Sequence, residues 1–458
     1  MRAFARQMTE RMKAVAAVGA VAAFWLAVWV FAAALAAQPL ILPGPGAVVV
    51  ALLRLVCDAG TWAILAGSGV RILGGLALAA VCGGVLAGIS SRSLTFARLV
   101  APALSFVKAT PVACVVVLLL IWLGSARVSI AAVFLMALPG VYFSLVEGLT
   151  QVDQSLEQMF HLHGVRGWRL FCAHTWREVL PFVLSCARAV IGMSWKAGVA
   201  AELIGMATGT VGERIYQAKL LIETADLLAW TVLVVAASWA CERVLVWLLR
   251  ASGPVAWRTA VRAHGHGLRG RTGAASDGAA AELALAVGDR APWAPALDGL
   301  VLHVPAGGRT CVMGASGVGK STLLALAAGE CAPCSMVFQD VRLVEDASAL
   351  DNVLVCADAR VDASSAAALL RLLVPGIDVH ARVAELSGGQ RRRVEIARAL
   401  LCPGGAVILD EPFTGLDIAA RDAYAEVVLD LLDGRMLLLA THDAADARAL
   451  DISDIITL

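Results

Sequence analysis

The sequence predicts two kinds of structure in one chain: an α-helical membrane domain with six transmembrane helices, followed by an α/β domain of the P-loop type. Three observations support this prediction. Of the 458 residues, 59% are hydrophobic and only 16% are charged, whereas soluble domains average about 25% charged residues. The longest apolar runs lie before residue 250. A glycine-rich phosphate-binding motif follows a short apolar strand after residue 309.

The same composition excludes several classes of protein. A chain this apolar is not disordered, collagen-like or an ordinary soluble enzyme. Its 37 basic and 36 acidic residues nearly cancel, which argues against nucleic-acid binding through bulk charge. The 11 cysteines are scattered, several of them in apolar runs. This pattern is typical of reduced thiols rather than of a disulfide framework.

Six apolar runs are long enough to cross a bilayer core of about 30 Å. The first, Ala14–Ala37, has 24 residues without a charge. It has a basic start, as a signal peptide has, but its apolar core exceeds the roughly 7–15 residues that are typical of one. We therefore expect a retained anchor. The six runs cover residues 14–37, 64–89, 99–124, 128–146, 179–205 and 227–249.

The basic residues predict the orientation of these helices. They cluster before the first run, after the second, after the fourth and after the sixth. The chain is therefore expected to be a multi-pass protein of the cell membrane. Because loops rich in Arg and Lys stay in the cytoplasm, both of its ends are expected there. The composition divides the chain into a membrane domain of residues 1–250, a flexible basic linker of residues 251–281 and an α/β domain of residues 282–458.

The phosphate-binding motif lies between an expected strand, 310–313, and an expected helix, 321–328. Glycines let backbone N–H groups surround phosphates, Lys320 is expected to reach the β- and γ-phosphates, and the Ser321 hydroxyl to bind Mg²⁺. ATP and Mg²⁺ are therefore the expected ligands. The residues expected to contact the nucleotide here are Gly314, Ser316, Gly317, Gly319, Lys320, Ser321 and Thr322.

Two further motifs point to the same chemistry. A buried strand, 406–409, ends in Asp410 and Glu411, which are expected to hold the Mg²⁺ shell and to polarise the attacking water. An acidic pair that caps a helix before Pro412 is the alternative. The second motif, Leu386-Ser387-Gly388-Gly389-Gln390, opens a helix and presents free N–H groups to an anion. A simple N-cap also explains its serine.

Together these motifs resemble those of ATP-binding-cassette (ABC) ATPases, which have an α/β P-loop (RecA-like) fold. The loop Gly415-Leu416-Asp417 and the triplet Thr441-His442-Asp443 extend the resemblance. It implies that one copy's signature, Ser387 to Gln390, completes the ATP site of a second copy, with Asp417 also at the nucleotide. It further implies that Glu411 is the catalytic base and His442 the switch histidine.

The resemblance assigns two more residues. Gln339 is expected to sense the γ-phosphate, to join the Mg²⁺ ligands Ser321 and Asp410, and to contact the membrane partner. Trp293, 27 positions before Lys320, is expected to stack on adenine; a tryptophan of a turn or of the core is the alternative.

There is one departure from the family. Only 18 residues separate Lys320 from Gln339, where the family has about twice as many, so little room remains for the usual antiparallel strands. We expect this shortening to affect the contacts to the base and the ATPase rate. The single Cys331-Ala332-Pro333-Cys334 motif lies here, and without a second pair it is not expected to bind metal.

The membrane half resembles binding-protein-dependent permeases. Leu156–Pro181, which we call the coupling segment, matches the cytoplasmic coupling loop of that family at Gly164, Trp168, Phe171 and Pro181. We expect the cassette to cover its aromatic residues Phe160, Trp168 and Phe171 in a groove beside Gln339. The alternative is an interfacial helix that lies on lipid.

These resemblances imply an importer in which permease and ATPase are fused. It is expected to work as a homodimer with an extracytoplasmic solute-binding protein. Stretches 122–124, 195–202 and 338–343 resemble transporters of nitrate, sulfonates and taurine, and a thiamine-precursor pyrimidine is a further candidate solute. The alternatives are an exporter half-transporter, against which the short loop Ser90–Arg98 argues, and a membrane-bound ATPase with a regulatory role.

Charged residues inside the apolar runs are costly and need an explanation. We expect them to pair between helices or to snorkel. The alternative is that some of them line a polar path for an anionic solute. They are Arg71, Lys108, Arg188, Lys196 and Glu202.

Overall fold

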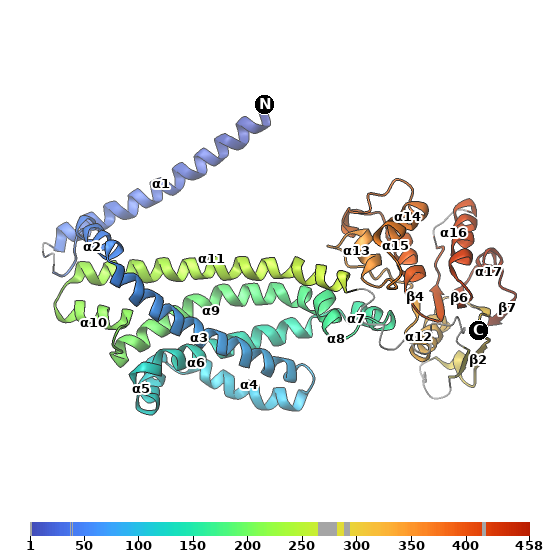
Figure 1. Cartoon of the computed structure of the whole chain (residues 1–458), viewed down its shortest axis with the longest axis horizontal. Helices are drawn as coiled ribbons and strands as arrows, with labels where there is room; N and C mark the ends of the chain where they lie inside the picture. Colours follow the sequence, from blue (N-terminus) through green and yellow to red (C-terminus); the bar gives the residue numbers. More distant parts are fainter. Residues whose placement is uncertain (1, 37, 39, 264–281, 288–293, 415–417) are drawn as a thin grey trace. The chain divides into compact units, whose positions relative to one another are not determined.

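The computed structural model describes residues 2–36, 38, 40–263, 282–287, 294–414 and 418–458. The chain forms two compact units (Figure 1). The first unit contains residues 1–151 and 179–251, and the second contains residues 152–178 and 252–458. The chain therefore leaves the first unit at residue 152, contributes to the second unit, and returns. The part that it contributes includes most of the coupling segment.

The described residues of the first unit form helices joined by short loops, with no strand among them. Local signals begin several of its helices: the Asp58 carboxylate caps α3, the Thr210 hydroxyl caps α10, and Pro45 starts α2. The helices are α1 (Arg2–Ala36), α2 (Pro45–Cys57), α3 (Ala59–Ser90), α4 (Leu94–Ala109), α5 (Val112–Leu123), α6 (Ser125–Thr150), α9 (Trp176–Gly205), α10 (Val211–Leu220) and α11 (Thr224–Arg262).

Five helical stretches among the described residues are long and apolar enough to cross a membrane, and a bent pair makes a sixth. The pair is α4 and α5, which meet at an angle of 102°. The expected apolar run over residues 99–124 is therefore a broken one, made of two helices. Pro111 explains the break, because it has no backbone N–H and forces the preceding Thr110 into an extended conformation (ψ 130°).

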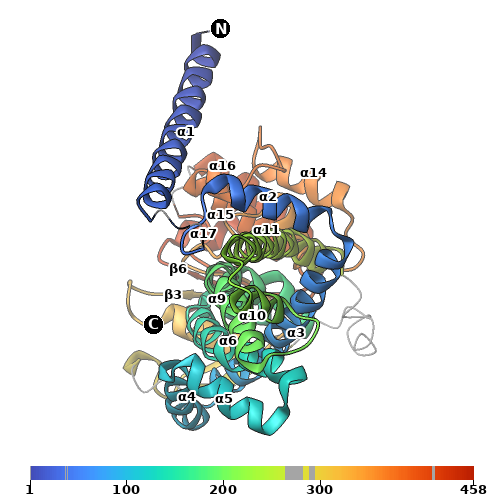
Figure 2. The same cartoon turned by 90° about the vertical axis from the view of Figure 1, so that its left-hand side faces the viewer.

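The helices α3 and α6 pack against each other (Figures 1 and 2), and small residues permit their close approach. A Cβ atom added at Gly75 of α3 would lie 2.5 Å from the carbonyl oxygen of Ile130 in α6. Only glycine permits this approach. Close backbone contact through small residues is the usual way in which membrane helices associate, because lipid offers no hydrophobic driving force between them.

Two of the charged residues inside the apolar runs, Arg71 of α3 and Glu202 of α9, lie close to each other. The Glu202 carboxylate is fully buried and accepts hydrogen bonds from the Ser68 hydroxyl (2.9 Å) and the Gly212 N–H (3.3 Å). An Nη1 atom of Arg71 lies 4.0 Å from this carboxylate. The two charges thus form a long ion pair between helices, in which neither Nη1 of Arg71 nor Oε1 of Glu202 has a hydrogen-bond partner within the described part of the chain.

The expected linker differs from the structure at its start. Residues 251–262 continue α11 instead of beginning a flexible segment. Trp257 and Ala260 of this extension are buried in the core of the second unit, and this burial stabilises the helix beyond residue 250. Residues 264–281 lie outside the described residues.

The second unit contains a parallel sheet with the strand order β4-β5-β6-β3-β7. Its strands are β3 (Arg309–Met313), β4 (Ser335–Val337), β5 (Ala406–Asp410), β6 (Met436–Thr441) and β7 (Asp454–Thr457). The central strands β5 and β6 are buried at every residue, as parallel strands between two helical layers are. The expected strands 310–313 and 406–409 are thus confirmed.

Helices and a short hairpin complete this unit. The hairpin joins β1 (Leu283–Ala286) to β2 (Val301–Val304) and is the single antiparallel pair of strands among the described residues. After α12 the chain passes directly to β4, so the expected loss of antiparallel strands is confirmed. The helices are α7 (Gln154–Leu162), α8 (Gly167–Leu170), α12 (Lys320–Glu330), α13 (Ala349–Leu354), α14 (Ala363–Leu373), α15 (Gly388–Leu401), α16 (Ile418–Leu431) and α17 (Ala444–Ala449).

Candidate active site

The phosphate-binding loop joins β3 to α12. Gly319 has a φ of +113°, a left-handed conformation that favours glycine, and α12 begins at the next residue. The Lys320 ammonium donates hydrogen bonds to the carbonyl oxygens of Gly314 (2.8 Å) and Ala315 (3.0 Å). The loop therefore surrounds its own lysine, and the free N–H groups at the start of α12 provide a site for phosphate. Ser316, Gly317 and Ser321 are exposed, and Thr322 is half-buried.

The acidic pair lies at the carboxyl end of β5, next to this loop. The Glu411 carboxylate lies 4.0 Å from the Lys320 ammonium and 3.3 Å from Nδ1 of His442. Three predicted residues from three elements are thus brought together. The backbone of Glu411 has a φ of +47°, which is strained for a residue with a Cβ atom. Such strain persists only where the surroundings hold it, and it is common at active sites.

Asp410 and Ser321 form the candidate metal site. The Ser321 hydroxyl hydrogen-bonds to the Asp410 carboxylate. Burial raises the pKa of Asp410, and the nearby Glu411 carboxylate adds to this effect. Hard oxygen donors of this kind fit Mg²⁺, which commonly completes its shell with water and phosphate oxygens. The described residues contain no cluster of three or more His, Cys, Asp or Glu for a metal, so nucleotide phosphates would have to supply ligands.

The signature motif begins α15. The Ser387 hydroxyl accepts from the Gln390 N–H (3.3 Å), and the Gln390 side chain accepts from the Ser387 N–H (2.9 Å). This capping box satisfies two of the first N–H groups of the helix. Gly388 and Gly389 are exposed, so the start of α15 is open for an anion.

The remaining predicted residues are less closely associated with this site. Gln339 follows β4 and is exposed. Trp293 and Asp417 lie outside the described residues, so their expected roles at adenine and at the nucleotide stay predictions.

The coupling segment packs on the same α/β unit through α7. Met159 and Phe160 are fully buried in the cluster that also contains Cys334, Met336 and Phe338. This confirms the contact expected for Phe160. The expectation for Trp168 is wrong, because 75% of its surface is exposed. Its ring stacks instead on the partly exposed Phe171, with centroids 5.1 Å apart.

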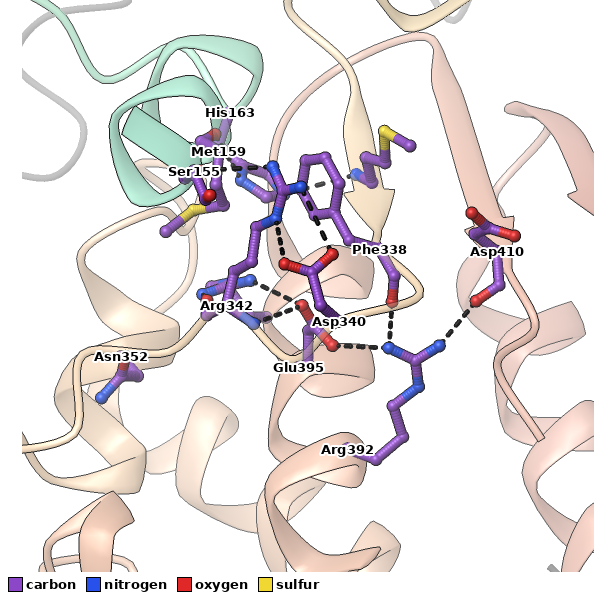
Figure 3. Close-up of polar contacts among 12 residues, drawn as sticks. Ser155, Met159, His163, Phe338, Asp340, Arg342, Asn352, Arg392, Glu395 and Asp410 are labelled. Atoms are coloured by element: carbon purple, nitrogen blue, oxygen red, sulfur yellow. Dashed lines mark hydrogen bonds and ion pairs between the residues drawn. The ribbon is translucent and has the colours of Figure 1, made fainter. Parts of the chain in front are cut away.

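Polar contacts reinforce this packing (Figure 3). The Cys334 N–H donates to the Leu162 carbonyl oxygen at the end of α7 (2.9 Å). Arg342 donates to the Ser155 carbonyl oxygen (3.2 Å) and to the Gln158 side chain (3.1 Å). The shortened stretch between Lys320 and Gln339 thus provides one of the surfaces that α7 contacts.

His163, directly after α7, is buried at this interface. Its Nδ1 lies 2.9 Å from the Met159 carbonyl oxygen, to which it donates, and its Nε2 accepts from the Met336 N–H (3.4 Å). Burial and, to a smaller extent, the positive charge of Arg398 together lower the pKa of His163 to about 3, against a raising effect of the Met159 carbonyl. The ring is therefore neutral at physiological pH.

We expect acid to weaken the docking of α7 through this histidine. Between pH 6.5 and pH 3, His163 binds a proton in the unfolded state but not in the folded state. Its contribution to the free energy of unfolding is therefore complete above pH 6.5 and is lost as the pH falls. At pH 5 the loss is about 2 kcal/mol. Denaturant unfolding at pH 7.5 and pH 5 measures it. A His163→Asn variant should lose this part of the pH dependence, whereas His303→Asn, at an exposed position, should keep it. If the free energy of unfolding changed equally between pH 7.5 and pH 5 in wild type and in His163→Asn, the prediction would be contradicted.

Sequence reasoning missed His163 and a set of buried charges on α15. Glu395 and Arg398 are fully buried, and Arg392 is nearly so. The i, i+3 spacing from Arg392 to Glu395 does predict a pair on a helix surface. Burial of that pair was not visible, because it depends on elements that pack against α15 from elsewhere in the chain.

The chain matches two protein families over most of its length. Residues 80–255 match the family described as binding-protein-dependent transport system inner membrane component, and residues 297–414 match the ABC transporter family. A dimeric bacterial ABC transporter cassette is 25% identical over 36% of this chain and 86% of its own, with a TM-score of 0.32.

Two curated relatives are aliphatic sulfonates import ATP-binding proteins. The one from Rhizobium johnstonii is 37% identical over 175 residues, which are 33% of this chain and 64% of the relative. The one from Escherichia coli strain K12 is 36% identical over 176 residues, which are 34% of this chain and 68% of the relative. The chain thus spans about two thirds of the length of these relatives. It belongs to the ABC transporter family, as a multi-pass membrane protein that joins a binding-protein-dependent permease component to an ATP-binding cassette in one polypeptide.

Proposed function

We propose that the chain imports a small anionic solute of the sulfonate type at the expense of ATP. The cassette binds and hydrolyses ATP, two copies of the chain form the working unit, and an extracytoplasmic binding protein delivers the solute. The family matches of the two halves support an importer. The sulfonate import relatives of the cassette favour sulfonates among the candidate solutes.

The observation that carries this proposal is the seating of α7 on the cassette. A helix that lies between two membrane-spanning helices in the sequence buries Met159 and Phe160 beside β4. The next residue but one after β4 is Gln339, whose expected partner is the γ-phosphate. A change at the nucleotide therefore has a short route to the membrane helices.

The residues around the phosphate-binding loop divide the chemistry between them. Lys320 and the N–H groups at the start of α12 hold the phosphates, Ser321 and Asp410 would hold Mg²⁺, and Glu411 accepts the proton of the attacking water. When bound, Mg²⁺ neutralises charge on the phosphates. His442, 3.3 Å from Glu411, orients that carboxylate. The open start of α15 is suited to the γ-phosphate of a nucleotide bound by the second copy.

Uptake by cells that natively carry this chain tests the proposal, because those cells also supply the binding protein. Deleting the chain should abolish ATP-dependent uptake of ethanesulfonate or taurine. The wild-type chain should restore uptake and Lys320→Ala should not. Unchanged uptake after deletion would argue against import. In reconstituted vesicles, ATP-driven movement away from the cassette side without a binding protein would identify an exporter instead.

A further inference from the structure

A buried glutamate forms the centre of a polar network on α15. The Glu395 side chain is fully buried, and both of its oxygens are used (Figure 3). Oε2 accepts from Arg392 (2.9 Å), and Oε1 accepts from Arg398 (3.4 Å) and from the backbone N–H of Arg342 (3.2 Å). A buried carboxylate is costly unless it is paired in this way. The two arginines and the Arg342 N–H therefore stabilise the buried charge of Glu395.

Arg392 joins this glutamate to the ends of two strands. Its Nη1 atom donates to the carbonyl oxygen of Phe338, the residue before Gln339. Its Nη2 atom donates to the carbonyl oxygens of Asp410 (2.6 Å) and Glu411 (3.0 Å). One planar guanidinium thus holds the backbone at the ends of β4 and β5. One of the bonded carbonyls belongs to Glu411, which has a strained φ of +47°.

The same glutamate reaches the coupling segment through Arg342. The Arg342 backbone is bonded to Glu395, and its guanidinium lies 3.7 Å from the centre of the Phe338 ring. From there it donates to the Ser155 carbonyl oxygen and to Gln158 on α7. A continuous chain of contacts therefore runs from α7 through Arg342 and Glu395 to Arg392, and from Arg392 to the backbone of the catalytic carboxylate.

We propose that Arg392, held by Glu395, is a positioning residue that links the seating of α7 to the backbone of Glu411. The Arg392 guanidinium is bonded to Glu395 and to backbone carbonyl oxygens, so it acts through the backbone of Glu411 rather than on the nucleotide. It sets the direction of the Glu411 side chain by holding the strained backbone. When Arg342 moves with α7, the hydrogen bonds from Arg392 to the carbonyl oxygens of Asp410 and Glu411 weaken or strengthen. The proposal rests on the proposed function in one respect, the assignment of Glu411 as the catalytic base.

Full-length protein in lipid nanodiscs provides the test, with no solute or binding protein present. An Arg392→Gln variant should bind Mg-ATP with unchanged affinity, because the phosphate-binding loop is intact. Its kcat should fall by about 10- to 100-fold, as expected for a misplaced catalytic group, with little change in KM. Hydrogen exchange of residues 154–162 should respond to a non-hydrolysable ATP analogue in wild type and not in the variant. Arg392→Lys should lie between the two, because one ammonium cannot reproduce the planar fork.

Two further variants separate positioning from folding. Arg391→Gln removes a neighbouring arginine that contacts Leu386, Ala384 and Glu345 but not the strand ends, and it should keep both kcat and the exchange response. The double variant Arg392→Gln, Glu395→Gln removes one positive and one negative charge together, while Arg398 keeps its hydrogen bond to the Arg342 carbonyl oxygen. It should stay folded and still lose both readouts.

A folded Arg392→Gln or double variant with wild-type kcat and a wild-type exchange response would overturn the proposal. A kcat loss without loss of the exchange response would overturn the link to α7. Because neither readout involves solute, failure of the import assay would leave this result interpretable. If instead the Arg392 variants behaved like wild type, the proposal of import would stand, because uptake by the wild-type chain does not depend on which residue positions Glu411.

Discussion

Replacing Glu411 with glutamine is expected to slow ATP turnover by roughly 10²- to 10⁴-fold, the usual contribution of a general base. The reason is geometric. Glu411 lies at the end of β5, 4.0 Å from the Lys320 ammonium and beside His442, so its carboxylate is next to the loop where the γ-phosphate is expected to bind. Glutamine keeps the size of the side chain but does not accept the proton. ATP binding should persist, and the ATP-bound dimer should accumulate.

Steady-state phosphate release and gel filtration in Mg-ATP measure the two effects. Glu426→Gln is the matched control, because it makes the same chemical change at an exposed position on α16. Its turnover should equal that of wild type. If Glu411→Gln hydrolysed ATP at the wild-type rate, another residue would have to be the base, and the assignment of the site would be wrong.

Replacing Phe160 with alanine is expected to separate ATP hydrolysis from uptake. The ring is fully buried against β4 and next to His174, with centroids 5.8 Å apart. Its loss leaves a cavity and costs about 3–5 kcal/mol, a large part of the binding of a nine-residue helix such as α7. The cassette should continue to hydrolyse ATP, but motion at the nucleotide should no longer reach the membrane helices, and uptake should be lost.

The experiment compares solute moved per ATP hydrolysed, together with the free energy of unfolding. Trp168→Ala is an informative control, because Trp168 lies in the same segment and is larger, but it is 75% exposed. It should change the stability little. If Phe160→Ala had the stability of wild type and moved as much solute per ATP hydrolysed, α7 would not be the element that transmits the motion.

Much of the site was predictable because its residues act through local backbone patterns. The glycines around Lys320 and the serine at the start of α15 have roles that a strand–loop–helix motif requires. Glu411 and Asp410 are adjacent in sequence, so the end of one strand positions both. The bend between α4 and α5 was also signalled locally, by Pro111, although the angle of 102° was not.

The expectation for Trp168 failed for a different reason. An aromatic residue in a cytoplasmic loop has the same sequence signature whether a partner covers it or a neighbouring ring does. Phe160 and Trp168 therefore looked equivalent, and only the packing of α7 on β4 separated the buried ring from the exposed one. His163 likewise reads as an ordinary histidine of a loop until Met336 and Met159 are placed around it.

The amino-acid order alone determined the membrane half and the ATPase half, and it predicted the residues at the phosphates, because hydropathy runs and phosphate-loop geometry depend on neighbours in the chain. Only the tertiary structure decided that residues 152–178 belong with the cassette and that Arg342, Glu395 and Arg392 connect them to the end of β5. Those contacts join residues that are far apart in sequence. Their burial depends on how helices and sheet pack, which no local pattern specifies.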